Sequence, residues 1–143
     1  MTTTRSTLPE KNNSLIKNYR LPKRLKPYFY DITIKTTFNI LTEPDLFDGE
    51  IFINFTCIER TNSVIFHKKQ LNITSVSVKF EAIEYSLHST SYDEETEIFN
   101  VTLSQMLEIG NNYSISMSYH GKFLNNNIGF YKNFYLDSND TKK

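Results

Sequence analysis

The sequence predicts an all-β domain: an antiparallel β-sandwich or β-saddle of about eight or more short strands with little helix. Apolar and polar residues alternate with period two along most of the chain, as they do in strands with one buried face. Turn signals separate these segments, and residues 104–109 form the only segment with a helical pattern.

The length of 143 residues predicts a single domain with a sizeable core. Residues 1–18 are polar and almost free of aromatic side chains, so we expect a flexible lead or stalk. The domain itself is predicted over residues 19–137, with a short tail at 138–143. Pro22 and Pro27 favour an extended chain ahead of the first strand.

The first strand is predicted from Tyr28 onward. Its inward positions are Tyr30, Ile32, Ile34 and Phe38, and its outward positions are Asp31, Thr33, Lys35 and Thr37. Residues 42–49 are predicted to form a polar connection that closes in a turn at Asp48-Gly49.

A second strand follows this connection. Its inward positions are Ile51, Ile53, Phe55 and Cys57, and its outward positions are Glu50, Asn54 and Thr56. Phe52 interrupts the polar face, which suggests that a neighbouring sheet lies over it.

The middle of the chain predicts four further strands. Residues 63–67 form a short strand, and residues 71–80 form a longer one whose phase changes near Thr74, which indicates a β-bulge. Residues 82–88 and 97–103 are predicted to pair as a hairpin around an acidic turn. In the second of these strands, Phe99, Val101 and Leu103 are expected to point inward and Asn100 outward.

The last part of the chain contains the most regular alternation. One helical turn is predicted over residues 104–109, ending at Gly110. Then Tyr113, Ile115, Met117 and Tyr119 are predicted to face the core, and Gly121 ends this strand. Residues 122–129 are predicted as a polar loop and 130–136 as a final strand.

Charge and cysteine content exclude several classes of protein. Sixteen acidic and sixteen basic side chains give a formal net charge of zero, which argues against a nucleic-acid partner. Cys57 is the only cysteine, so no internal disulfide can form, and its apolar neighbours predict a buried position. No apolar run approaches the roughly 18 residues that span a membrane. The first residues lack the apolar core of a signal peptide, which by itself favours the cytoplasm.

Glycosylation sequons favour the opposite compartment. Asn-x-Ser/Thr acceptors occur at Asn12, Asn54, Asn72, Asn100, Asn112 and Asn139. Asn54, Asn100 and Asn112 fall on predicted outward faces, where a glycan would not disturb the core. The direction of Asn72 is ambiguous because of the nearby phase change. These candidate sites favour a secreted or luminal protein.

The sequence predicts no catalytic, cofactor-binding or metal-binding residues. The three histidines, His67, His88 and His120, do not have the spacing of a zinc motif. No nucleophile elbow or glycine-rich phosphate loop occurs. The acidic residues Asp93, Glu94, Glu95 and Glu97 lack the ligand spacing of a calcium loop, so a solvated turn is expected.

Several short strings nevertheless resemble the first domain of the aminopeptidase N-like zinc metallopeptidases. The strings at the start of the resemblance are Arg20-Leu21-Pro22, Pro27, Tyr30, and Phe47 with Gly49. Those that follow are Ile65 with His67, Leu71 with Ile73, Tyr119 with Gly121, and Gly129-Phe130-Tyr131. Leu124 stands one place later than the family pattern has it. The resemblance covers residues 19–137, and the order of the strings makes it specific.

The resemblance implies a non-catalytic β-saddle that packs beside a zinc-containing catalytic domain and forms one wall of the substrate cavity. The zinc helix and the residues that bind peptide substrates lie further downstream in that family, so zinc belongs to the full-length enzyme. The family implies a plasma-membrane ectodomain or extracellular protein. The matched glycines Gly49, Gly121 and Gly129 are expected in turns, and Tyr30 and Tyr119 in the core.

Two other hypotheses remain open from the sequence. The chain could be a stand-alone β-sandwich for binding or adhesion, or a truncated non-catalytic paralogue that regulates a full-length enzyme. Because the family saddle is longer than this chain, we also expect an unpaired sheet edge that favours homo-association.

Overall fold

The computed structural model describes residues 18–36 and 46–123, and these residues form eight strands and no helix. The first four strands are β1 (Leu25–Thr36), β2 (Leu46–Cys57), β3 (Thr61–His67) and β4 (Leu71–Phe80). The other four are β5 (Ile83–Tyr85), β6 (Leu87–Asp93), β7 (Ile98–Leu107) and β8 (Asn112–Lys122). Every strand pairing is antiparallel, which confirms the predicted all-β class.

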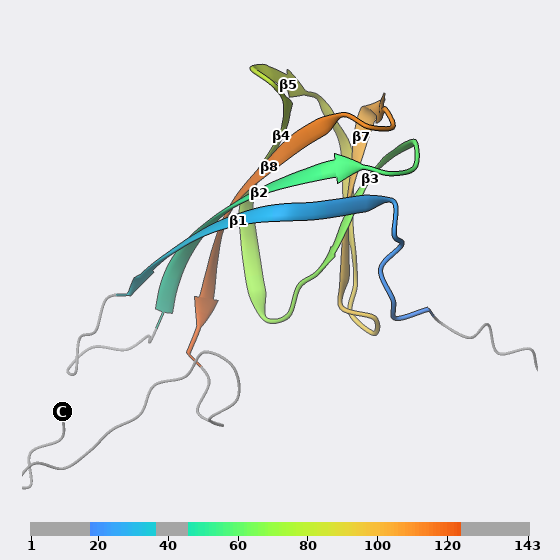
Figure 1. Ribbon diagram of the computed structural model, residues 1–143. Helices are drawn as coiled ribbons and strands as arrows, with labels where there is room; N and C mark the ends of the chain where they lie inside the picture. Colours follow the sequence, from blue (N-terminus) through green and yellow to red (C-terminus); the bar gives the residue numbers. More distant parts are fainter. Residues whose placement is uncertain (1–17, 37–45, 124–143) are drawn as a thin grey trace, which may run out of the picture.

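The strands form two sheets. Sheet A has the order β1-β2-β8-β4-β5, and sheet B has the order β3-β7-β6. Figure 1 shows sheet B against the end of sheet A where β2 finishes and β8 begins, while the other ends of β1, β2 and β8 project beyond it. Sheet B therefore covers only part of the inner face of sheet A.

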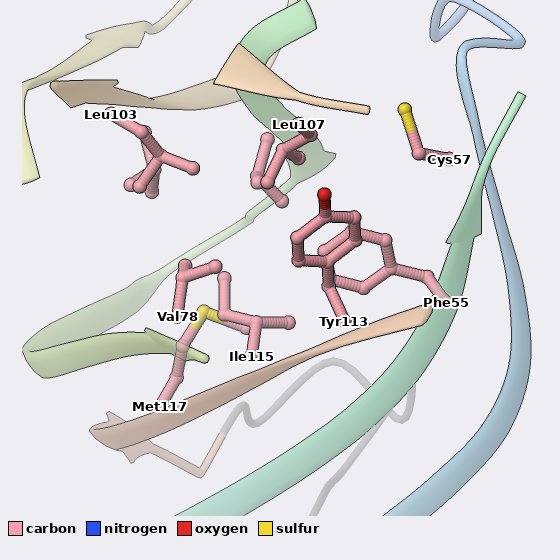
Figure 2. Packing of buried hydrophobic residues seen from close by; sticks show 10 residues of the cluster. Phe55, Cys57, Val78, Leu103, Leu107, Tyr113, Ile115 and Met117 are labelled. Carbon is pink, nitrogen blue, oxygen red and sulfur yellow. The ribbon is translucent and has the colours of Figure 1, made fainter. Parts of the chain in front are cut away.

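The core lies between the two sheets (Figure 2). Its fully buried members come from both of them: Cys57, Val78 and Ile115 from sheet A, and Val101, Leu103 and Leu107 from sheet B.

Tyr113 is the centre of the aromatic packing in this core. Its ring centroid lies 5.9 Å from that of Phe55, 5.2 Å from Phe80 and 5.8 Å from Tyr85. The Tyr113 hydroxyl accepts a hydrogen bond from the backbone N–H of Glu108 at 2.9 Å, which satisfies its polar end. Burial beside Tyr113 raises the pKa of the Tyr85 phenol.

The predicted periodicity of several strands is confirmed. In β8, Tyr113, Ile115 and Met117 are buried, and in β7 Val101 and Leu103 are buried. The predicted bulge in β4 is present, because the register with β8 shifts between Ile73 and Ser75. The hydroxyl of Thr74, the extra residue, donates to the carbonyl of Ser118 at 3.1 Å.

The first strand forms where it was predicted, but the predicted burial of its apolar face is wrong. Tyr30 and Ile32 are each 54% exposed and Ile34 is 43% exposed. These side chains do lie on the inner face, since they pair with Ile53, Ile51 and Gly49 of β2. They are exposed because β1 is the edge strand of sheet A, and sheet B lies beside only its first part, where Tyr30 lines a pocket with Val64 and Phe66 of β3. Tyr30 is therefore not a core residue.

The turn predicted at Asp48-Gly49 is also wrong. Both residues lie inside β2, and Gly49 pairs with Ile34 on one side and Tyr119 on the other. A Cβ atom at Gly49 would overlap the ring of Tyr119, and one at Gly121 would overlap Phe47 and Leu71. Gly121 lies one residue inside the end of β8. At both positions glycine allows close side-chain approach across the sheet rather than a turn.

Three further predictions differ from the structure. The helical turn predicted over residues 104–109 is wrong, because β7 continues to Leu107 and the chain turns at Gly110, whose φ is 84°. The hairpin partner of β7 is β6 rather than residues 82–88, because β5 pairs with β4 instead. Among the described residues no second sheet covers Phe52, which is 37% exposed.

We predict that the Gly49→Ala substitution destabilises the domain by about 1–3 kcal/mol, because the added methyl group overpacks against the Tyr119 ring. Chemical denaturation measures this change. The same substitution in a Tyr119→Leu background should cost less, because the ring is then absent. An equal cost in both backgrounds would contradict the close-approach explanation.

Candidate functional site

The first surface of interest is the apolar edge of sheet A. Tyr30, Ile32 and Ile34 form a continuous row of exposed side chains on the inner face of β1. Among the described strands, β1 pairs only with β2, so its other edge offers backbone donors and acceptors. An exposed strand edge with apolar side chains is a surface that attracts a partner.

The outer face of sheet A is mainly polar. Along β8 this face carries Ser114, Ser116, Ser118 and His120. Next to them on β2 and β1 lie Glu50 and Lys35, whose charged groups are 3.8 Å apart and well exposed. Phe29 and Phe52 are the exposed aromatic exceptions. This composition suits contact with water rather than a buried interface.

An apolar pocket of about 170 Å³ lies between β1, β2 and β3, beside the segment that precedes β1. The preceding segment contributes Leu21 and Pro22, and β3 contributes Val64 and Phe66. Arg24 is the only ionisable lining residue besides Tyr30. The pocket can therefore accept an apolar group, but it has no acid–base or metal-binding chemistry.

Hydrogen bonds hold this preceding segment against the sandwich. The carbonyl of Arg24 accepts from the N–H groups of Ile58 and Glu59, at 2.7 and 3.1 Å. The carbonyl of Tyr19 lies 3.0 Å from Nε2 of His67, and the Tyr19 hydroxyl donates to Glu95 at 3.2 Å. We call residues 19–24 the strap. The strap contains the Arg20-Leu21-Pro22 string and runs from the turn before β7 to the start of β1.

The three histidines lie on three different strands and have different neighbours. His67 contacts the strap, and Nε2 of His120 lies 2.9 Å from Nδ2 of Asn72. His88 is exposed on β6. Residues 18–36 and 46–123 contain no group of three His, Cys, Asp or Glu side chains that could hold a metal ion.

The acidic turn uses its carboxylates for local structure. Oδ1 of Asp93 accepts hydrogen bonds from the N–H groups of Glu95 and Thr96, at 2.9 and 3.2 Å. Glu97, which has a φ of 59°, forms an ion pair with Lys69 at 3.0 Å. The turn is thus organised by its own backbone and neighbouring side chains.

Cys57 is buried in β2, as predicted. Its thiol donates to the carbonyl of Glu59 at 3.1 Å. Burial, and to a smaller extent the nearby carboxylate of Glu108, raises the pKa of the thiol. Both features suit a packing role rather than a reactive one.

The described sequons differ in how accessible their side chains are. Asn54, Asn72 and Asn112 lie on the outer face of sheet A. Asn112 is exposed, and its Oδ1 accepts from the Thr56 hydroxyl at 2.7 Å. Asn54 is half-buried.

Asn100 lies in β7 on the side of sheet B away from the core, in a depression that Asn18 also lines. Its Oδ1 is buried and has no hydrogen-bond partner among the described residues. Asn100 thus lies on the face away from the core, as predicted, but its side chain is half-buried in this depression.

Comparisons with known proteins give this architecture a family. A family model described as the Peptidase M1 N-terminal domain matches residues 26–143. The chain belongs to this family. It is 31% identical to aminopeptidase N of Rattus norvegicus over 98% of this chain and 15% of that protein. It is also 31% identical to aminopeptidase N of Homo sapiens over 87% of this chain and 14% of that protein.

A third relative is endoplasmic reticulum aminopeptidase 1 of Rattus norvegicus, 29% identical over 82% of this chain and 13% of that protein. The chain therefore spans only about one seventh of the length of these relatives. The match to the family model confirms the family that the sequence motifs indicated. The described part of the chain contains no helix that is both long and apolar enough to cross a membrane.

The structure shows what several residues of the M1 N-terminal domain motifs do in this chain. Pro22 lines the pocket next to the strap, and Gly49 admits the Tyr119 ring. Other predictions lie outside the described residues: the lead up to residue 17, Thr37 and Phe38 of the first strand, residues 42–45 of the polar connection, Leu124, Gly129, Phe130 and Tyr131, the strand at 130–136, the tail at 138–143, and the sequons Asn12 and Asn139.

We predict that this M1 domain, when secreted behind a signal peptide, is glycosylated at Asn112, Asn54 and Asn72 but much less at Asn100. Asn112 and Asn72 are exposed, whereas the Asn100 amide oxygen is buried in a depression. Mass spectrometry with and without glycosidase treatment measures the occupancy of each site. High occupancy at Asn100 in the folded protein, with Asn112 unmodified, would contradict this ranking.

Proposed function

We propose that this chain is the non-catalytic N-terminal domain of a zinc aminopeptidase that removes residues from the N-termini of peptides. In this proposal, the catalytic domain of the same enzyme supplies the zinc ion and the catalytic groups. The chain itself supplies a rigid β-sandwich against which that catalytic domain packs. It binds no metal and acts on peptides only as part of the whole enzyme.

The observation that carries the proposal is the family match over residues 26–143 in a chain that spans about one seventh of its aminopeptidase relatives. The family match agrees with this division of labour between two domains. So does the exposed inner row of Tyr30, Ile32 and Ile34, because an apolar face of this kind is typical of a surface that packs against another domain.

The proposal includes an extracellular or luminal location. Its support is the set of sequons on the outer face of sheet A, opposite the apolar inner row. A glycan-bearing outer face and a protein-covered inner face are compatible in one enzyme. The name of the third relative, which places that protein in the endoplasmic reticulum, is consistent with this location.

We predict that the purified 143-residue chain does not hydrolyse aminoacyl-naphthylamides and contains no stoichiometric zinc. Catalytic zinc requires about three protein ligands and an open position. Turnover assays with and without a chelator, together with elemental analysis, measure both properties. A full-length M1 aminopeptidase is the positive control, and one tightly bound zinc ion per chain would refute the proposal.

The transcript provides a second and independent test. Sequencing it beyond the codon for Lys143 should reveal an in-frame continuation that encodes Gly-Ala-Met-Glu-Asn and His-Glu-x-x-His strings. A stop codon at this position in a translated messenger RNA would instead favour a truncated paralogue.

A further inference from the structure

The edge of β1 that pairs with no other described strand is chemically self-complementary. Its outer face carries Asp31, Thr33 and Lys35 at alternate positions, and its inner face carries Tyr30, Ile32 and Ile34. All of these side chains are exposed. Asp31 lies two residues before Thr33, and Lys35 lies two residues after it. In an antiparallel pair of two such strands centred on Thr33, the Asp31 of one strand therefore lies opposite the Lys35 of the other.

We propose that β1 pairs with β1 of a second copy of this chain, antiparallel and with the twofold axis at Thr33. In this register, residues 30–36 of one copy lie opposite residues 36–30 of the other. Asp31 of each copy then faces Lys35 of its partner on the outer face. Ile32 of each copy faces Ile34 of its partner on the inner face, and the two sheets A become one continuous sheet.

The charges select this register from its neighbours. Directly opposite residues in an antiparallel pair place their side chains on the same face, so a symmetric pairing must have a residue on its axis. An axis at Asp31 would place two aspartates opposite each other, and an axis at Lys35 would place two lysines opposite each other. An axis at Ile32 or Ile34 would leave each charge opposite a neutral side chain within the strand. Thr33 alone creates two opposite-charge pairs.

The local contacts of these residues permit the pairing. Asp31 has no ion pair within the described part of the chain. The ammonium group of Lys35 lies 3.8 Å from a carboxylate oxygen of Glu50, and both side chains are more than 60% exposed. Such an exposed ion pair is weak, so Lys35 can exchange it for a contact with a partner chain. Because one strand edge is smaller than a typical stable interface, we expect a dimer with a dissociation constant of about 10 to 100 μM.

Charge reversal tests the register. Analytical ultracentrifugation of the 143-residue chain over a concentration series should show a monomer–dimer equilibrium. Asp31→Lys or Lys35→Asp alone should raise the dimer dissociation constant at least about tenfold, because each creates two like-charge contacts. The double variant D31K/K35D should restore it to near the parent value. Lys26→Asp, in the same strand but outside the paired segment, is the matched control and should change little.

A cross-link gives a second readout that does not depend on affinity. Opposite Cα atoms in antiparallel strands are about 4.5 to 5.5 Å apart, which lies within disulfide range. Thr33→Cys should therefore oxidise rapidly to a disulfide-linked dimer. Ser116→Cys, exposed on the central strand β8, should not, and the parent Cys57 is fully buried.

Three outcomes would overturn the proposal. The first is a chain that stays monomeric well above 100 μM. The second is a dimer whose dissociation constant is unchanged in the single charge variants or is not restored in the double variant. The third is cross-linking through position 116 in preference to position 33. Thermal unfolding of each variant shows whether it is folded, and these exposed positions should leave the melting temperature close to that of the parent.

Discussion

The packing of sheet B onto one end of sheet A is the constraint on which the other features of this domain depend. Tyr113 is at the centre of that contact, with three aromatic rings around it and its hydroxyl hydrogen-bonded to the backbone of Glu108. A tyrosine whose hydroxyl is hydrogen-bonded in this way combines a large apolar contact with a fixed ring orientation. The two sheets are thereby held together where β2 ends and β8 begins (Figure 2).

Partial coverage divides sheet A into surfaces with different chemistry. Under sheet B, its inner face is a closed core. Further toward β1, the same face presents Tyr30, Ile32 and Ile34 to its surroundings. The outer face is rich in serine and threonine and bears three sequons. A domain with one polar face and one uncovered apolar row is well suited to lie between solvent on one side and protein on the other.

The titratable side chains of this domain make structural contacts. The cysteine is buried with a raised pKa, the acidic turn uses Asp93 to hold its own backbone, and the histidines contact the strap and Asn72. The close approaches at Gly49 and Gly121 serve packing across the sheet. The described residues thus contribute shape and rigidity, which agrees with membership of the M1 N-terminal domain family.

The sequence by itself determined the strand class, most strand positions, the bulge at Thr74 and the family. These features follow from local periodicity and from short strings of residues, which a single chain displays in full. The burial of β1, the role of Gly49, the end of β7 and the accessibility of Asn100 were decided only by the tertiary structure. Periodicity tells which side chains share a face of a strand, but not whether a second sheet covers that face. Coverage depends on where sheet B ends, and that is set by packing between residues far apart in the sequence.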